Sequence, residues 1–129
     1  EQLADLSNQL GIKSYVPQLH SDRDKFADIP AEDVYKMDSD QVAKSDIMLA
    51  YVGELSHGVG QEVEIANREK TLVILIHEKG KRISRMMKGS PNIIDIIEFE
   101  SIEDALGKVQ IALEKFKTTA FQRNISHIS

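Results

Sequence analysis

The chain has no cysteine among its 129 residues, so it can form neither a disulfide framework nor a thiolate metal site. A composition without cysteine fits a reducing compartment, and we expect a cytoplasmic protein. Tryptophan is also absent and aromatic residues make up 5% of the chain, which argues against an aromatic platform for stacking nucleic-acid bases. Purely apolar runs reach about six residues, far short of the ~20 that a membrane-spanning helix needs.

Positive charge is also scarce. The formal net charge is -5, and one basic cluster stands out, Lys79-Gly80-Lys81-Arg82. A protein that binds nucleic acid through its backbone phosphates needs a broad basic surface. We therefore expect neither a nucleic-acid partner nor a membrane partner. The length suits one domain with its own hydrophobic core.

Apolar runs of strand length alternate with helical patterns along the chain. This alternation predicts an α/β fold in which a parallel, Rossmann-like sheet carries helices on both faces. The segment 31–44 reads as a helix in one or two pieces, and a helix from Ser101 begins with a capping-box-like Ser101 and Asp104. We predict strands at 12–16, 47–52, 71–76 and 93–99, and helices at 1–10, 31–44, 58–70, 83–88 and from 101 onward.

The first predicted element is unusual for such a fold. Doubly wound sheets usually open with a strand, whereas this sequence opens in a helix. We therefore expect the first strand of the sheet to be missing from this chain. The segment 118–129 has no strong pattern and is read as a C-terminal tail.

The segment Ser56-His57-Gly58-Val59-Gly60-Gln61-Glu62 lies between a predicted strand and a predicted helix. Exposed backbone amides at a helix start attract anions, and glycines let a ligand approach the backbone closely. Glu62 has two interpretations. It is either an ordinary first-turn carboxylate facing the helix dipole, or a nucleophile or base that the dipole holds ionised. Glu64 points away from Glu62 on a helix.

Further polar residues near this segment also have two interpretations each. Ser56 either caps the turn or, with the amides near Gly58 and Gly60, binds a phosphate. Asp38 and Asp40 precede or begin a helical stretch, where each could be an N-cap.

Ser84 on its own reads as a surface serine, and Asp46 as a structural residue before a strand. His57 lies in the turn itself, where it could touch a phosphate or a sugar. The four histidines lack metal-ligand spacing, so we predict no metal site.

Taken together, these motifs resemble the nucleoside 2-deoxyribosyltransferase superfamily, and within it the 2'-deoxynucleoside 5'-phosphate N-hydrolases. Asp38 falls at the expected distance before the motif glutamate. The resemblance covers about 1–116, so we assign 1–117 to one domain of this type and 118–129 to the tail. It rests on Ser45-Asp46, Ser56-x-Gly58-x-Gly60-x-Glu62 and Ile83-Ser84-x-x-Met87-x-Gly89.

The resemblance implies a flavodoxin-like fold and a nucleotide substrate. In this family the motif glutamate attacks the anomeric carbon of the sugar, which makes Glu62 the expected nucleophile of a retaining double displacement. Asp38 would then assist proton handling near the sugar and base. Neither a metal nor an organic cofactor is expected.

Ser56 indicates which substrate such an enzyme would take. Relatives that use free nucleosides tend to have Asp here, which would repel a 5'-phosphate, whereas Ser can donate a hydrogen bond to it. The resemblance therefore implies a nucleoside 5'-monophosphate. Ser84 resembles a family serine that reaches the phosphate from the neighbouring subunit, which implies a homodimer with shared active sites.

Three alternatives stay open beside hydrolysis. The first is base exchange between nucleosides, against which Ser56 argues. The second is a phosphoribohydrolase of the cytokinin-activating type, whose Pro-Gly-Gly-x-Gly-Thr pattern is absent. The third is a non-catalytic nucleotide-binding module. The expected absence of the first strand, with the aromatic, Gly and Ser residues of its loop, favours this last alternative.

Overall fold

A computed structural model describes residues 2–17, 29–53, 57–83 and 85–128 of the chain. Two residues of the predicted site, Ser56 and Ser84, lie outside this description. In chain order the elements are α1 (Gln2–Gln9), β1 (Ser14–Tyr15), α3 (Ala31–Lys44), β2 (Ile47–Tyr51), α4 (His57–Arg68), β3 (Leu72–Glu78), α5 (Arg85–Lys88), β4 (Ile93–Phe99) and α6 (Ile102–Ile128).

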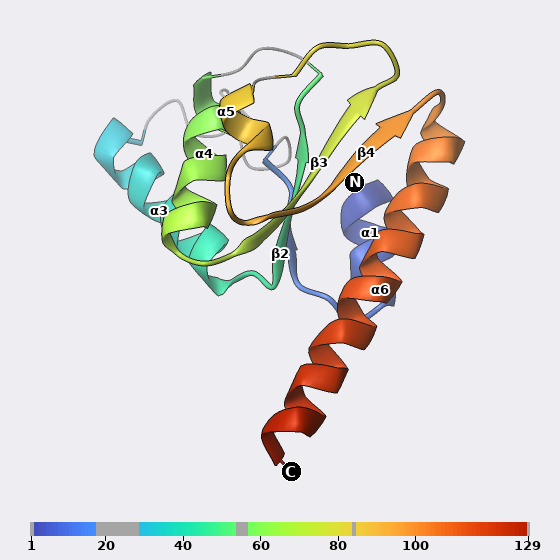
Figure 1. Ribbon diagram of the computed structural model, residues 1–129. Coiled ribbons are helices and arrows are strands. Elements are labelled where there is room, and N and C mark those ends of the chain that lie inside the picture. The colour runs from blue at the N-terminus through green and yellow to red at the C-terminus, as the bar shows by residue number, and fades with distance from the viewer. Residues whose placement is uncertain (1, 18–28, 54–56, 84, 129) are drawn as a thin grey trace.

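The strands form one open, four-stranded sheet in the order β1-β2-β3-β4, and every neighbouring pair is parallel. Helices α3, α4 and α5 lie on one side of the sheet, and α1 and α6 on the other (Figure 1). The predicted α/β fold, with a parallel sheet covered on both faces, is therefore confirmed. Parallel strands need crossover connections, and α4 supplies the one between β2 and β3.

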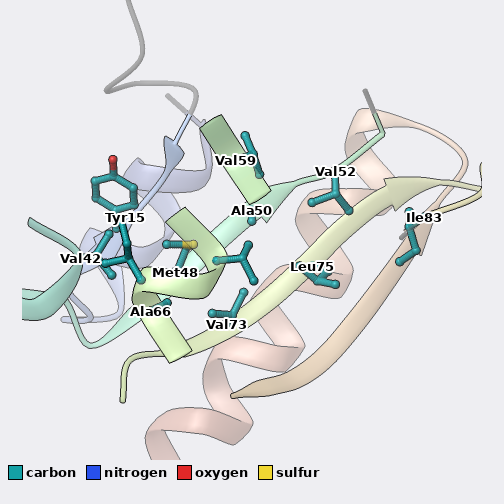
Figure 2. Packing of buried hydrophobic residues seen from close by; sticks show 12 residues of the cluster. Tyr15, Val42, Met48, Ala50, Val52, Val59, Ala66, Val73, Leu75 and Ile83 are labelled. Carbon is teal, nitrogen blue, oxygen red and sulfur yellow. The ribbon is translucent and has the colours of Figure 1, made fainter. Parts of the chain in front are cut away.

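The two central strands are buried on both faces, which explains their continuous apolar sequences. Alternate side chains of a strand point to opposite faces, so each strand contributes to two separate hydrophobic clusters. Met48 and Leu75 belong to the cluster under α3 and α4, seen in Figure 2. Leu49 and Ile74 belong to the cluster under α1 and α6.

The amino-terminal ends of β3 and β4 are tied to the end of α4 by one side chain. The Nδ2 of Asn92 donates to the carbonyl oxygens of Ala66 and Thr71 at 2.9 and 3.0 Å. The backbone of Asn92 also accepts from the Val73 amide at 2.9 Å. Thr71 is itself buried and donates its hydroxyl to the Val42 carbonyl at 2.9 Å, which adds α3 to the same junction. These bonds satisfy carbonyls that end a helix without an intrahelical partner.

Several element boundaries differ from the prediction. The first strand is shorter than the predicted 12–16, because only Ser14 and Tyr15 pair with β2 and the buried Pro17 has no amide hydrogen to donate. The segment 31–44 is one helix, and α5 covers 85–88 rather than 83–88.

The predicted helix start at Ser101 is confirmed. The Ser101 hydroxyl accepts from the Asp104 amide at 3.1 Å, and the Asp104 carboxylate accepts from the Glu100 amide at 3.1 Å. The helix that follows, α6, continues to Ile128, and its second half extends past the sheet in Figure 1. Within the described residues, no helix is both long and apolar enough to cross a membrane.

Replacing Leu113 by Ala tests the packing of α6 against the sheet. Leu113 is fully buried, so we expect the free energy of unfolding to fall by about 2–5 kcal/mol in urea denaturation. Ile111→Ala on the same helix is a matched control, because Ile111 is 56% exposed and loses the same number of carbons. Equal destabilisation by the two variants would contradict the observed orientation of α6.

Candidate active site

The helix α4 begins at His57, one residue before the predicted start at 58, so Gly58 and Gly60 lie in its first turn. Glycines with positive φ in the described residues are Gly11 and Gly80, so neither motif glycine needs a left-handed backbone. The amides of a first helical turn have no intrahelical acceptor, and they can therefore bind an anion.

Gly60 lies where α4 and α5 approach each other. A Cβ built at Gly60 would stand 3.5 Å from the Cε of Met87 on α5. Met87 packs against the hydrophobic cluster under α4. α5 lies near the first turn of α4 (Figure 1), and a Cβ at position 60 would make an ordinary van der Waals contact with Met87. The side chain of His57 lies outside the described side chains, so its choice between phosphate and sugar stays a prediction.

Glu62 is buried in the second turn of α4. It is 6% exposed, and its Oε2 has no hydrogen-bond partner among the described residues. Glu62 is the sixth residue of α4, so the interpretation that places it in the first turn, facing the helix dipole, is wrong. Glu64 is exposed and faces away from Glu62, as the helical spacing predicted.

Tyr15 is the residue of this site that sequence reasoning missed. It is 1% exposed, pairs with Met48 of β2, and belongs to the cluster beneath α4. Its hydroxyl points away from Val42 and Met48 in Figure 2. Interaction between the Tyr15 hydroxyl and the Glu62 carboxyl lowers the pKa of Glu62 and raises that of Tyr15.

Asp38 completes the cluster from α3. It is half-buried, and its negative charge raises the pKa of Glu62 and of Tyr15. Asp38 and Asp40 both lie within α3, so the interpretation of either as an N-cap is wrong. Asp40 is exposed. The structure thus brings together the two carboxylates, Asp38 and Glu62, that the sequence singled out.

Burial sets the protonation of Glu62. Desolvation is the largest cause, and together with the charge of Asp38 it outweighs the opposing bond from Tyr15 and raises the pKa of Glu62 to about 7. Near neutral pH the carboxyl is therefore divided between its acid and its anion. A group with this pKa can act as a nucleophile and can also exchange a proton at working pH.

Other residues named from the sequence have structural roles. Asp46 accepts from the Lys13 amide at 2.9 Å and donates its own amide to the Lys13 carbonyl at 2.8 Å. Ser45 ends α3, with its hydroxyl donating to the Gln41 carbonyl at 2.7 Å. In the described part of the chain, no group of three or more His, Asp and Glu side chains is arranged to hold a metal ion.

A hollow of about 220 Å³ lies on the opposite face of the sheet from Glu62. Its lining is apolar and contains no carboxylate or histidine, so it lacks the groups that the chemistry above uses. It is lined by Gln2, Leu3, Tyr51, Ile76, Phe99, Ile102, Ala105 and Leu106.

Comparison with known proteins identifies a structural neighbour. The sequence matches no protein-family model and no curated protein. The fold is similar to that of the CMP N-glycosidase BcmB of Clostridium botulinum, with a TM-score of 0.60 and 19% identity over 67% of this chain and 73% of that one. That neighbour is a member of the nucleoside 2-deoxyribosyltransferase-like superfamily, which the sequence motifs resemble. At this identity the likeness establishes the shared fold.

Two substitutions should move the pKa of Glu62 in opposite directions. Tyr15→Phe removes the hydrogen bond that lowers this pKa, so the pKa should rise above about 7; Asp38→Asn removes a like charge, so it should fall. Carbon-detected NMR titration of the Glu62 carboxyl measures both shifts. Glu64→Gln is the control, since Glu64 is exposed and does not affect Glu62. Shifts of the same sign in Tyr15→Phe and Asp38→Asn would contradict the cluster.

Burial of Glu62 should also make folding stability depend on pH. The folded pKa of about 7 lies above the ordinary 4.5, so the stabilisation is complete below pH ~4.5 and is lost as pH rises through about 7. The loss is about 3 kcal/mol at most. Glu62→Gln cannot ionise, so its unfolding free energy should lack this decline when both proteins are denatured across pH 4–9. Parallel pH profiles for the two proteins would count against the raised pKa.

Proposed function

We propose that this chain hydrolyses the N-glycosidic bond of nucleoside 5'-monophosphates, with Glu62 as the nucleophile. The observation that carries the proposal is the burial of the Glu62 carboxyl on α4, where one of its oxygens has no hydrogen-bond partner among the described residues. The Tyr15 hydroxyl and the charge of Asp38 both act on this carboxyl. A buried carboxylate of this kind costs stability, so its presence favours a chemical role over a packing role. The fold shared with a CMP N-glycosidase supports the same class of reaction.

The proposed reaction has two displacements. The ionised Glu62 attacks the anomeric carbon, the carbon–oxygen bond of a glycosyl ester forms, and the bond to the base nitrogen breaks. The departing base takes up a proton, and Asp38 assists that transfer. Water then attacks the same carbon, which releases the sugar 5-phosphate and regenerates the Glu62 carboxylate.

Tyr15 and burial prepare Glu62 for the first displacement. The surroundings withhold water from the carboxyl, which leaves its anion less solvated and more nucleophilic than an exposed glutamate. The Tyr15 hydroxyl offsets part of this cost by stabilising the anion. Tyr15 thus keeps the pKa of Glu62 from rising further above neutral.

The phosphate is proposed to bind at the start of α4. Amides of its first turn, around Gly58 and Gly60, are available to an anion, and the preceding Ser56 can donate its hydroxyl. We also propose that Ser84 of a second copy completes the site, so that the active form is a homodimer. His57 stands at the first position of α4 and is proposed to contact the substrate.

Base release from nucleoside monophosphates tests the proposed function. We expect the protein to release free base from at least one member of a ribo- and deoxyribonucleotide panel, followed by chromatography. Glu62→Ala should lower the rate by about a thousandfold or more, because it removes the nucleophile. The rate of the intact enzyme should rise with pH through about 7 as Glu62 loses its proton.

Glu64→Ala is the matched control for this experiment. Glu64 lies on the same helix but is exposed, so its removal should leave base release unchanged. An unchanged rate of base release in Glu62→Ala would contradict the mechanism. No release of base from any nucleotide would contradict the proposed function. Faster release from free nucleosides than from their monophosphates would contradict the assigned substrate class.

A further inference from the structure

The strand β4 ends the described sheet, so one of its edges pairs with β3 and the other is an outer edge. The outer edge of a sheet offers backbone amides and carbonyls that can pair with a strand from another chain. The sequence of β4, IIDIIEF, is rich in isoleucine and therefore favours strand pairing. Ile94 and Ile96 are also 45% and 38% exposed. This edge therefore needs protection if the chain is not to pair with its own copies.

One backbone bond shows which groups of β4 point to the outer edge. The Lys79 amide, directly after β3, donates to the Phe99 carbonyl at 2.8 Å, so the Phe99 carbonyl faces β3. Successive residues of a strand direct their backbone groups alternately to its two sides, and the register with β3 is regular from 95 to 99. The amides and carbonyls of Ile96 and Glu98 therefore point to the outer edge.

Two charged side chains already bind outward-facing groups of this edge. The Oδ1 of Asp95 accepts from the Ile96 amide at 2.9 Å. The Nζ of Lys108, on α6, donates to the Glu98 carbonyl at 2.7 Å. This capping pair, Asp95 and Lys108, thus occupies one donor and one acceptor of the edge with side chains of opposite charge. Neither backbone group can pair with an incoming strand unless the side chain moves away.

Asp104 holds the lysine of the capping pair in place. Its Oδ2 stands 3.0 Å from the Lys108 Nζ one turn further along α6, and it also accepts from the Glu100 amide at 3.1 Å. The hydrogen bond from the Glu100 amide, followed by the bond to Lys108, lowers the pKa of Asp104. The carboxylate therefore stays ionised at neutral pH, and Lys108 is held between it and the Glu98 carbonyl.

Two further features of β4 discourage strand addition. The strand has one extra residue, Ile94, between the partners of Val73 and Ile74, and such a bulge disrupts the regular spacing that a new partner needs. Beside the outer edge, β4 and α6 bound an open groove of about 370 Å³. A strand that entered this groove would meet the capping pair before it reached the backbone of β4. The charged lining residues of the groove are Asp95, Glu98, Lys108 and Lys115.

We propose that the capping pair closes the outer edge of β4 against the same edge of a second copy. Two identical edges can pair across a two-fold axis, because each copy presents amides and carbonyls that the other can bind. Bonds within one copy already satisfy the Ile96 amide and the Glu98 carbonyl, so pairing would exchange these bonds and not add to them. This role at β4 is independent of the proposed hydrolysis.

Glu98 and Lys115 provide a matched control on the same two elements. The Glu98 side chain is exposed on β4, and Lys115 lies about two turns along α6 from Lys108, in the same groove. Asp95→Ala with Lys108→Met removes one charge of each sign, and so does Glu98→Ala with Lys115→Met. The first pair of substitutions removes both bonds to the edge, whereas the second leaves both in place.

Sedimentation velocity over a range of protein concentrations compares the parent with the two double variants. We expect Asp95→Ala/Lys108→Met to form a species of twice the parent's mass, and Glu98→Ala/Lys115→Met to keep the parent's mass. In the doubled species, hydrogen exchange followed by NMR should show slower exchange of the Glu98 amide, because pairing gives this amide a partner. Asp95 and Lys108 are exposed, so the circular dichroism of the variant should match that of the parent.

A third substitution checks that association runs through the outer edge. Adding Ile96→Pro to Asp95→Ala/Lys108→Met should restore the parent's mass, because proline has no amide hydrogen to donate to a second strand. Proline is tolerated at an edge position whose amide points away from the sheet, as that of Ile96 does.

Four results would overturn this role of the capping pair. An unchanged mass in Asp95→Ala/Lys108→Met would show that the edge does not need the two side chains. Equal doubling in Glu98→Ala/Lys115→Met would assign the effect to surface charge. Association that survives Ile96→Pro, or that leaves exchange of the Glu98 amide unchanged, would place the contact elsewhere on the molecule.

Discussion

Five consecutive residue pairs join β2 to β3, from Ile47 with Leu72 to Tyr51 with Ile76. Because this pairing is parallel, the chain must return along the sheet before β3 can begin, and α4 makes that return. The crossover places the amino-terminal end of α4 at the edge where both strands end. The apolar face of the helix must then cover the sheet, which carries Glu62 inward together with Val63 and Ala66. The geometry of the site follows from this one pairing.

The buried carboxyl sets both the proton affinity of the candidate site and its cost in stability. Desolvation raises the pKa of Glu62, and the same effect makes the ionised protein less stable. Tyr15 and Asp38 act on the carboxyl in opposite directions, so its pKa reflects the balance of burial, the Tyr15 hydroxyl and the charge of Asp38. This arrangement is typical of functional sites, where stability is given up for a group poised near the working pH.

The sequence predicted the layered fold, because that depends on patterns along the chain, whereas Asp38 and Glu62 were linked by the family resemblance. The long apolar runs at β2 and β3 allow few other arrangements. The start of α4 was predicted to within one residue, although glycines discourage helix. Tyr15 gave no local signal, because its contact with Glu62 depends on how a two-residue strand pairs with β2. The direction of the pKa shift likewise requires knowledge of burial.

The side-chain amide of Asn92 makes the two ends of the sheet unequal. At the amino-terminal edge it joins α4, β3 and β4 through carbonyls of Ala66 and Thr71. At the opposite edge the strands lead into the connecting segments beside the candidate site. Insertions, deletions and exchanges of sequence can therefore accumulate beside the site while the scaffold stays the same. In evolutionary terms, a hydrogen-bonded junction at one edge of the sheet lets the same fold acquire new specificities at the other edge.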